Sequence, residues 1–221
     1  MPIGYDPLLG ELRSSNAKLI VSQPVHFPGK PFLHLPLHDD AKDISPYQHE
    51  IPDNYMVFTK DGWASGELQF PLPDTDLSEM TLSANVKISG RGDMFGIDSD
   101  DRGFFWENRG GSYTVLETWN GSYDHEFPQG ETGEAFHLTA TLSGNIITVY
   151  VNGILWEQEN WSSLDFPGAV FYIWDGWGLI SDVRLYNTCL TDAEVWDVYQ
   201  TDNRGSALPY CKRKQLQCPY F

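Results

Sequence analysis

Length, composition and charge restrict the kinds of protein that this chain can be. Its 221 residues are 41% hydrophobic and 14% aromatic, so it can bury a sizeable core and is neither disordered nor fibrous. The 31 acidic residues against 14 Lys and Arg give a formal charge of −17, which repels phosphate backbones and anionic membrane faces. This charge excludes nucleic acid as an expected partner, and solubility or a salty medium explains it better than an acidic functional surface does.

The first 31 residues predict an extended docking arm rather than a membrane or export segment. No stretch of the chain approaches the ~18–20 uninterrupted apolar residues that span a bilayer. The first ten residues lack the basic start of a secretion signal, so we expect neither a signal peptide nor a transmembrane segment. Proline recurs throughout residues 1–31, which favours extended backbone. The docking residues expected in this arm are Tyr5, Leu8, Leu9 and Leu12.

Alternation of apolar and polar residues predicts strands through the middle of the chain. It is clearest at residues 80–88, where every even-numbered residue is apolar, as a strand with one buried and one solvent-facing side requires. It returns at 136–142, and glycine-containing turns at 143–145 and 152–153 then join this strand to two more, at 146–151 and 154–156. Further strands are predicted at residues 32–37, 55–58, 67–70, 94–97, 103–106, 113–119, 169–174 and 179–186.

A single helix is predicted after the last strand. Thr191 and Glu194 have the spacing of a capping box, and an apolar stripe follows them. Residues 201–221 then form a basic tail in which Cys211 and Cys218 flank three consecutive cations. These two cysteines would form a disulfide in an oxidising compartment and remain free thiols in a reducing one.

The middle of the chain resembles the laminin G-like, or concanavalin A-like, jelly-roll superfamily. The matching segments are the opening strand and acidic turn at 32–45, the strand at 80–88, the Asn-Gly hairpin at 147–155, and the closing strand with its helix at 178–199. The resemblance covers residues 32–200. It implies an all-β, antiparallel jelly-roll β-sandwich with one short C-terminal helix. The N-terminal docking arm (1–31) and the C-terminal tail (201–221) lie outside the resemblance.

The chain lacks the catalytic pattern of the glucanases in this superfamily. Those enzymes carry carboxylates as Glu-x-Asp-x-x-Glu, because alternating residues of a strand point into one cleft. Glu157 and Glu159 alternate here, but no third acid completes the pattern. Nucleophile elbows, zinc-binding His-Glu-x-x-His and glycine-rich phosphate loops are absent from the sequence as well. We therefore predict that the protein is not an enzyme and rank a glycan-active hydrolase third.

Two aspartates match the positions at which many members of the superfamily hold a structural calcium ion. Asp43 lies in the acidic turn after the opening strand, and Asp182 lies in the closing strand. Calcium takes about six to eight oxygen ligands, so neighbouring carbonyls would have to supply most of them. The alternative is that Asp43 starts a turn and Asp182 pairs with Arg184 or with the backbone.

The aromatic sequence at residues 172–178, Tyr-Ile-Trp-Asp-Gly-Trp-Gly, is the candidate recognition site. Trp174 and Trp177 would stack on a sugar ring while Asp175 binds its hydroxyl groups. Trp119 and Trp161 are further candidates for the same site. Packing in the sandwich core is the competing interpretation, and it is stronger for Trp174 than for Trp177.

The opening residues, MPIGYDPLLGELR, resemble the N-termini of accessory virion proteins of tailed bacteriophages. This resemblance implies a capsid decoration or a tail or fibre protein, made in the host cytoplasm and located in the virion. Its arms would dock on other capsid or tail proteins or on further copies of itself, and its sandwich would face a host-surface glycan. The alternative function is a carbohydrate-binding adhesion module, which an exposed aromatic surface would favour.

Overall fold

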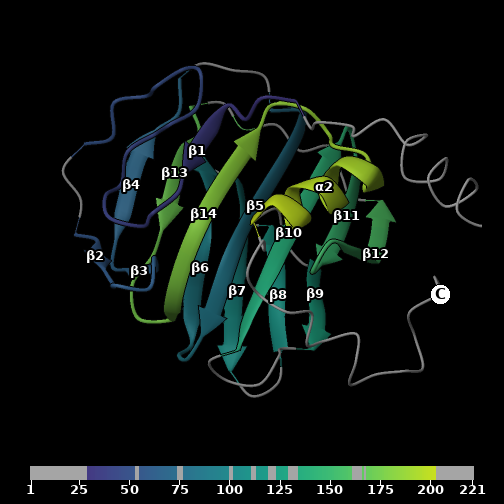
Figure 1. Cartoon of the computed structure of the whole chain (residues 1–221). Coiled ribbons are helices and arrows are strands. Elements are labelled where there is room, and N and C mark those ends of the chain that lie inside the picture. The colour runs from purple at the N-terminus through teal and green to yellow at the C-terminus, as the bar shows by residue number, and fades with distance from the viewer. Residues whose placement is uncertain are drawn as a thin grey trace, which may run out of the picture.

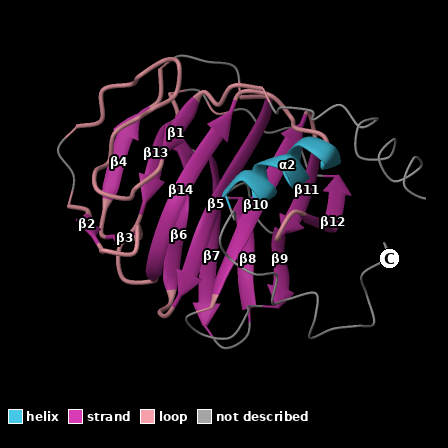
Figure 2. Ribbon diagram, viewed as in Figure 1, coloured by secondary structure: helices cyan, strands magenta, loops and turns pink. Residues whose placement is uncertain are grey.

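Two antiparallel sheets packed face to face form the described part of the chain (Figure 1). The structure is a computed structural model that describes residues 29–52, 55–73, 77–99, 102–110, 113–118, 123–128, 134–160, 166 and 168–202. Figure 2 shows that helix α2 (Asp192–Asp202) lies across the outer side of one sheet. The structure confirms the predicted all-β antiparallel sandwich with a short C-terminal helix.

The sheet that carries the helix is called sheet A here. Its strands are β1 (Leu33–Leu35), β2 (Val57–Phe58), β3 (Ala64–Ser65), β5 (Glu79–Ile88), β10 (Ala135–Ser143), β11 (Ile146–Val151), β12 (Ile154–Asn160) and β14 (Gly178–Tyr186). Within the described residues they run in the order β12-β11-β10-β5-β14-β3-β2, and β1 also pairs with β14.

The second sheet is called sheet B. Its strands are β4 (Leu68–Pro71), β6 (Gly92–Ser99), β7 (Arg102–Gly110), β8 (Tyr113–Thr118), β9 (Tyr123–Pro128) and β13 (Val170–Ile173). They run in the order β4-β13-β6-β7-β8-β9, so β13 and β6, which are distant in sequence, lie side by side.

The core lies between the two sheets and follows from the period-two pattern of their strands. The even-numbered residues of β5 point inwards, and each is at most 1% exposed. Sheet B contributes aromatic residues: Phe95 stacks on Trp106 with 6.4 Å between ring centroids, and Phe104 meets Phe166 edge to face at 6.3 Å. Burial of this apolar surface is the main stabilisation of the sandwich.

The outer face of sheet A differs from the prediction, because its polar residues are buried too. The odd-numbered Thr81 and Ser83 of β5, expected to face solvent, are at most 1% exposed. The chain after β14 covers this face: the Thr81 hydroxyl donates to the carbonyl of Thr188 (3.0 Å) and accepts from the N–H of Leu190 (2.9 Å). The alternation of apolar and polar residues therefore predicts correctly which side of β5 faces the core. It carries no information about what packs on the other side of the strand.

Helix α2 completes this cover. Its predicted capping box is confirmed, because the N–H and hydroxyl of Thr191 both donate to Glu194 Oε2 at 2.8 Å. The apolar side of the helix and the preceding loop form a second, smaller core with sheet A, made of Tyr150, Tyr186, Leu190, Val195 and Val198. No helix in the described part of the chain has the length and apolar character that crossing a membrane requires.

The predicted Asn-Gly turn joins β11 to β12. Asn152 and Gly153 have φ of 53° and 73°, as a type I′ turn requires. A Cβ at Gly153 would lie 2.9 Å from the Trp196 ring and 3.0 Å from Tyr199, so this turn also needs glycine to fit beneath α2.

Candidate functional site

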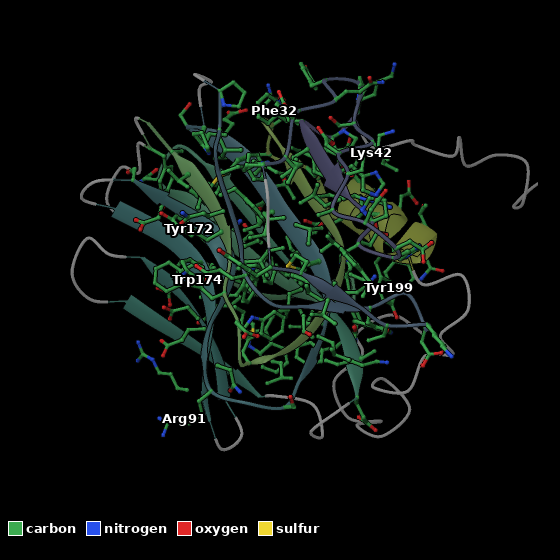
Figure 3. All side chains as sticks on the ribbon, turned by 90° about the vertical axis from the view of Figure 1, so that its left-hand side faces the viewer. Phe32, Lys42, Arg91, Tyr172, Trp174 and Tyr199 are labelled. Atoms are coloured by element: carbon green, nitrogen blue, oxygen red, sulfur yellow. The ribbon has the colours of Figure 1, made fainter. Side chains whose placement is uncertain are left out.

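The outer face of sheet B presents aromatic side chains from β13 and from Trp174, the residue that follows it. Phe171 and Ile173 point into the core, so the alternating residues Tyr172 and Trp174 point outwards and are half-buried. Their rings stack with centroids 5.0 Å apart and planes 8° apart. The N–H of Trp174 donates to the carbonyl of Met94 (2.9 Å), which holds the residue against β6. Figure 3 shows both rings on the side of the molecule opposite to α2.

Phe105 of β7 supports this pair of rings from the neighbouring strand. Its ring lies 5.5 Å from Trp174 and is tilted by 58°. Strand β6 lies between β13 and β7, and its Gly96 pairs with Tyr172 of β13 on one side and with Phe105 of β7 on the other. A Cβ at Gly96 would collide with Phe105, so glycine is what allows the strands and rings to approach this closely. Phe105, Tyr172 and Trp174 are called the aromatic platform below.

Carboxylates lie at both ends of the aromatic platform. At one end, burial and the charge of Asp98 raise the pKa of Tyr172. At the other end, Glu107 of β7 is the cross-strand partner of Asp93 of β6, so the two carboxylates share a face. Burial and the charge of Glu107 raise the pKa of Asp93 above its ordinary value of 3.8. Arg109 Nε donates to Glu107 Oε2 at 2.8 Å.

Trp177 lies in the core and not on this face, contrary to the expectation that it binds sugar. Its side chain is 1% exposed, and its indole Nε1 donates to the carbonyl of Trp174 at 2.5 Å. Trp177 faces inwards while Trp174 faces outwards because the chain turns between them at Gly176, whose φ is 87°. Asp175 is exposed at this turn, where its Oδ1 accepts from the N–H of Gly176 (2.7 Å).

Several predicted residues lie outside the described residues, and those predictions stand as they were made. They are the recognition candidates Trp119 and Trp161, the arm residues Tyr5, Leu8, Leu9 and Leu12, and the cysteines Cys211 and Cys218. The boundaries of the arm (1–31) and of the tail (201–221) fall at or near the ends of the described chain.

Protein donors already surround Asp43, the first predicted calcium ligand. Its Oδ1 accepts from the N–H groups of His34 (2.9 Å) and Ser45 (2.8 Å). Its Oδ2 accepts from the N–H of His49 (2.8 Å) and lies 2.7 Å from the His49 ring Nδ1. Burial would raise the pKa of Asp43, but these hydrogen bonds outweigh it and hold the pKa below its ordinary value of 3.8.

Asp182, the second predicted calcium ligand, lies in a bulge of β14 with φ of 51°. Its Oδ1 is 2.6 Å from His34 Nε2 and its Oδ2 is 3.0 Å from the Arg184 guanidinium, which confirms the alternative pairing with Arg184. Within the described residues, no three His, Cys, Asp or Glu side chains gather as a metal site would need. Because cations and N–H donors occupy both carboxylates, this donor set does not fit calcium.

We expect calcium to leave the melting temperature of the protein unchanged. Thermal unfolding in millimolar calcium and in excess chelator should give the same midpoint. Asp43→Asn should lower the midpoint equally in both conditions, because it removes charge-assisted hydrogen bonds and not a metal. A calcium-dependent rise in the wild type that Asp43→Asn abolishes would restore the metal site.

His137 is expected to make the free energy of unfolding depend on pH below neutrality. Its ring is fully buried, with Tyr199 at a centroid distance of 5.8 Å. Burial and the nearby Arg184 lower its pKa to about 3, against an opposing effect of Asp182. The unfolded chain therefore binds a proton before the folded chain does, so the free energy of unfolding should fall as the pH decreases from 6.5 towards 3.

The measurement is urea unfolding across this pH range in the wild type and in His137→Phe. We expect the variant to be less stable at neutral pH but to lose stability less steeply with acid. Equal pH slopes for both proteins would show that His137 does not cause the effect.

Comparison with known proteins now identifies the fold family. Residues 61–196 match the model of the concanavalin A-like lectin/glucanases superfamily. The chain belongs to this superfamily. The match confirms the resemblance seen in the sequence, and a search of curated protein sequences gives no match.

The chain is also similar in structure to solved domains of a toxin and of an arabinanase. The botulinum neurotoxin serotype D binding domain is 16% identical with a TM-score of 0.64, over 78% of this chain and 52% of that one. Domain 4 of AbnA, an extracellular GH43 arabinanase from Geobacillus stearothermophilus solved with arabinotriose, is 20% identical with a TM-score of 0.62, over 78% of this chain and 100% of that one. The chain spans about half the length of the neurotoxin binding domains. At these identities the similarity shows the fold alone.

Proposed function

We propose that this protein is a non-catalytic carbohydrate-binding module whose site is the aromatic platform of sheet B. The observation that carries the proposal is the stacked pair Tyr172 and Trp174, half-buried on the outer face of the sheet and supported by Phe105. Sugar rings have apolar C–H faces that pack on aromatic rings, while their hydroxyl groups donate to carboxylates. A platform flanked by carboxylates offers both kinds of contact, and this combination is typical of small-ligand sites.

The fold and the positions of the acidic residues support this proposal. Domain 4 of the arabinanase, which has the same fold, was solved with arabinotriose, and a saccharide ligand for this chain is the corresponding proposal. Glu157 and Glu159, the alternating acids considered for catalysis, lie on β12 of sheet A, in the other sheet from the platform. A glycosidase needs its two carboxyl groups on either side of the bound glycosidic bond, and these two are not placed at the platform.

A glycan array with three purified proteins tests the proposal. We expect the wild type to bind a subset of glycans, and Trp174→Ala to lose the same subset. Trp156→Ala is the matched control, because Trp156 is 39% exposed on β12, away from the platform. Absence of binding by the wild type, or its retention by Trp174→Ala, would refute the site. Release of reducing sugar from a bound glycan would contradict a non-catalytic role.

We also propose that the protein is an accessory component of a bacteriophage virion, a capsid decoration or a tail or fibre protein. This proposal rests on the resemblance of the opening residues to such proteins and not on the platform. Residues 1–31 would dock on other virion proteins, and the sandwich would display its platform to host glycans. Deletion of residues 1–31 should abolish incorporation into particles but retain glycan binding, whereas unchanged incorporation would refute the docking arm.

A further inference from the structure

Two carboxylates beside the aromatic platform, Asp93 and Glu107, affect which sugars it can bind. Asp93 and Glu107 face each other across β6 and β7, next to the strand position of Phe105. The Arg109 guanidinium bonds to Glu107. Among the described residues, no side-chain hydrogen bond or ion pair reaches the Asp93 carboxylate. Glu107 therefore has a protein cation as its partner, while the half-buried Asp93 carboxylate lies beside the charge of Glu107 without a donor of its own.

The proximity of the Asp93 and Glu107 carboxylates is unfavourable in the ligand-free protein, and a bound cation would make it favourable. A partly buried carboxylate without a donor loses hydration that nothing replaces, and the neighbouring carboxylate adds repulsion, consistent with the raised pKa of Asp93. The chain as a whole carries a formal charge of −17, so its field attracts cations and repels anions at the same surface. A ring face such as that of Trp174 also attracts an ammonium group.

We infer that the aromatic platform selects glycans with free, protonated amino groups, of the glucosamine type, and rejects glycans with carboxylate groups. The inference rests on the proposed function and names the ligand class of the same site. The sugar ring packs on Tyr172 and Trp174, and its ammonium group lies against Asp93 beside Glu107. A uronic or sialic acid in the same pose brings a third carboxylate to a pair that already repels itself.

Calorimetric titration with three short β-1,4-linked oligosaccharides tests this inference, because these ligands differ in charge but share a linkage. They are oligomers of glucosamine, of N-acetylglucosamine and of glucuronic acid. We expect the glucosamine oligomer to bind about two- to fivefold more tightly than its N-acetylated counterpart, as a partly exposed ion pair gives. The glucuronic acid oligomer should show no measurable binding.

Asp93→Asn is the decisive variant, and it should fold because the replaced carboxylate has no hydrogen bond to lose and its repulsion disappears. We expect it to bind the two glucosamine-based oligomers equally. Glu50→Gln, the same change of charge at an exposed loop residue between β1 and β2, should keep the wild-type preference. Trp174→Ala should weaken the binding of each oligomer that the wild type binds by at least about tenfold, which separates the site from general attraction of amines to an acidic protein.

The outcomes distinguish this inference from the proposed function. If binding depends on Trp174 but the affinities of the three oligosaccharides do not follow their charge, the inferred ligand class is wrong and the proposed carbohydrate-binding function is retained. If the amine preference survives Asp93→Asn, it does not come from this carboxylate and the inference is overturned. If neither these ligands nor the glycan array gives binding, the proposed function fails as well.

Discussion

Replacing Trp177 by alanine is expected to lower the free energy of unfolding by about 3–5 kcal/mol. The side chain is 1% exposed within the core between the two sheets, so its removal leaves a large cavity. It also removes the donor to the Trp174 carbonyl. Urea denaturation monitored by circular dichroism measures the change.

Trp174→Ala is the matched control for this stability experiment. Its side chain is half-buried on the outer face of sheet B, so its loss leaves no closed cavity and should cost clearly less stability. If Trp177→Ala were as stable as Trp174→Ala, the assignment of one indole to the core and the other to the surface would be wrong.

The same Trp174→Ala substitution is expected to weaken glycan binding by at least about tenfold. Trp174 provides the largest ring of the platform, and an aromatic anchor at the centre of a binding site is typically worth more than about 1.4 kcal/mol. Isothermal titration with a glycan identified on the array measures the loss.

Two further variants serve as controls for this binding experiment. Trp174→Phe retains a stacking face and should recover part of the affinity, whereas Trp156→Ala should bind like the wild type. Loss of affinity in Trp156→Ala together with normal binding by Trp174→Ala would move the site from sheet B to the edge of sheet A.

The strands could be predicted from the sequence wherever the alternation was long enough. The strand of residues 80–88 was predicted for this reason, whereas the hairpin around Asn152-Gly153 was predicted from its turn residues. In the described part of the chain, two strands were not predicted. β3 consists of Ala64 and Ser65 alone, which is too short for any periodicity, and β9 (Tyr123–Pro128) mixes charged residues with a proline.

The candidate site could be predicted only in part. Alternation in β13 carries the information that Trp174 lies on the side opposite to Phe171 and Ile173. The prediction that core packing is stronger for Trp174 than for Trp177 is the reverse of the observed burial. Alternation could not have predicted the position of Trp177, because the turn at Gly176 interrupts the strand period.

The residues that flank the platform were missed because they depend on pairing between strands. Asp93, Glu107 and Phe105 reach the platform through the register of β6 with β7 and β13, which local patterns do not contain. Gly96 was the available signal, since a glycine inside a strand pattern indicates a close approach of neighbouring chains.

The most direct test of the central claim is an NMR titration of the indole N–H signals with the bound glycan. The missing signal in the spectrum of Trp174→Ala assigns the Trp174 indole, and the same procedure assigns Trp156 and Trp177. We expect the signal of Trp174 and the backbone amides of Tyr172, Gly96 and Phe105 to shift. Shifts confined to Trp156 and the strands of sheet A, with the Trp174 signal unchanged, would contradict the account.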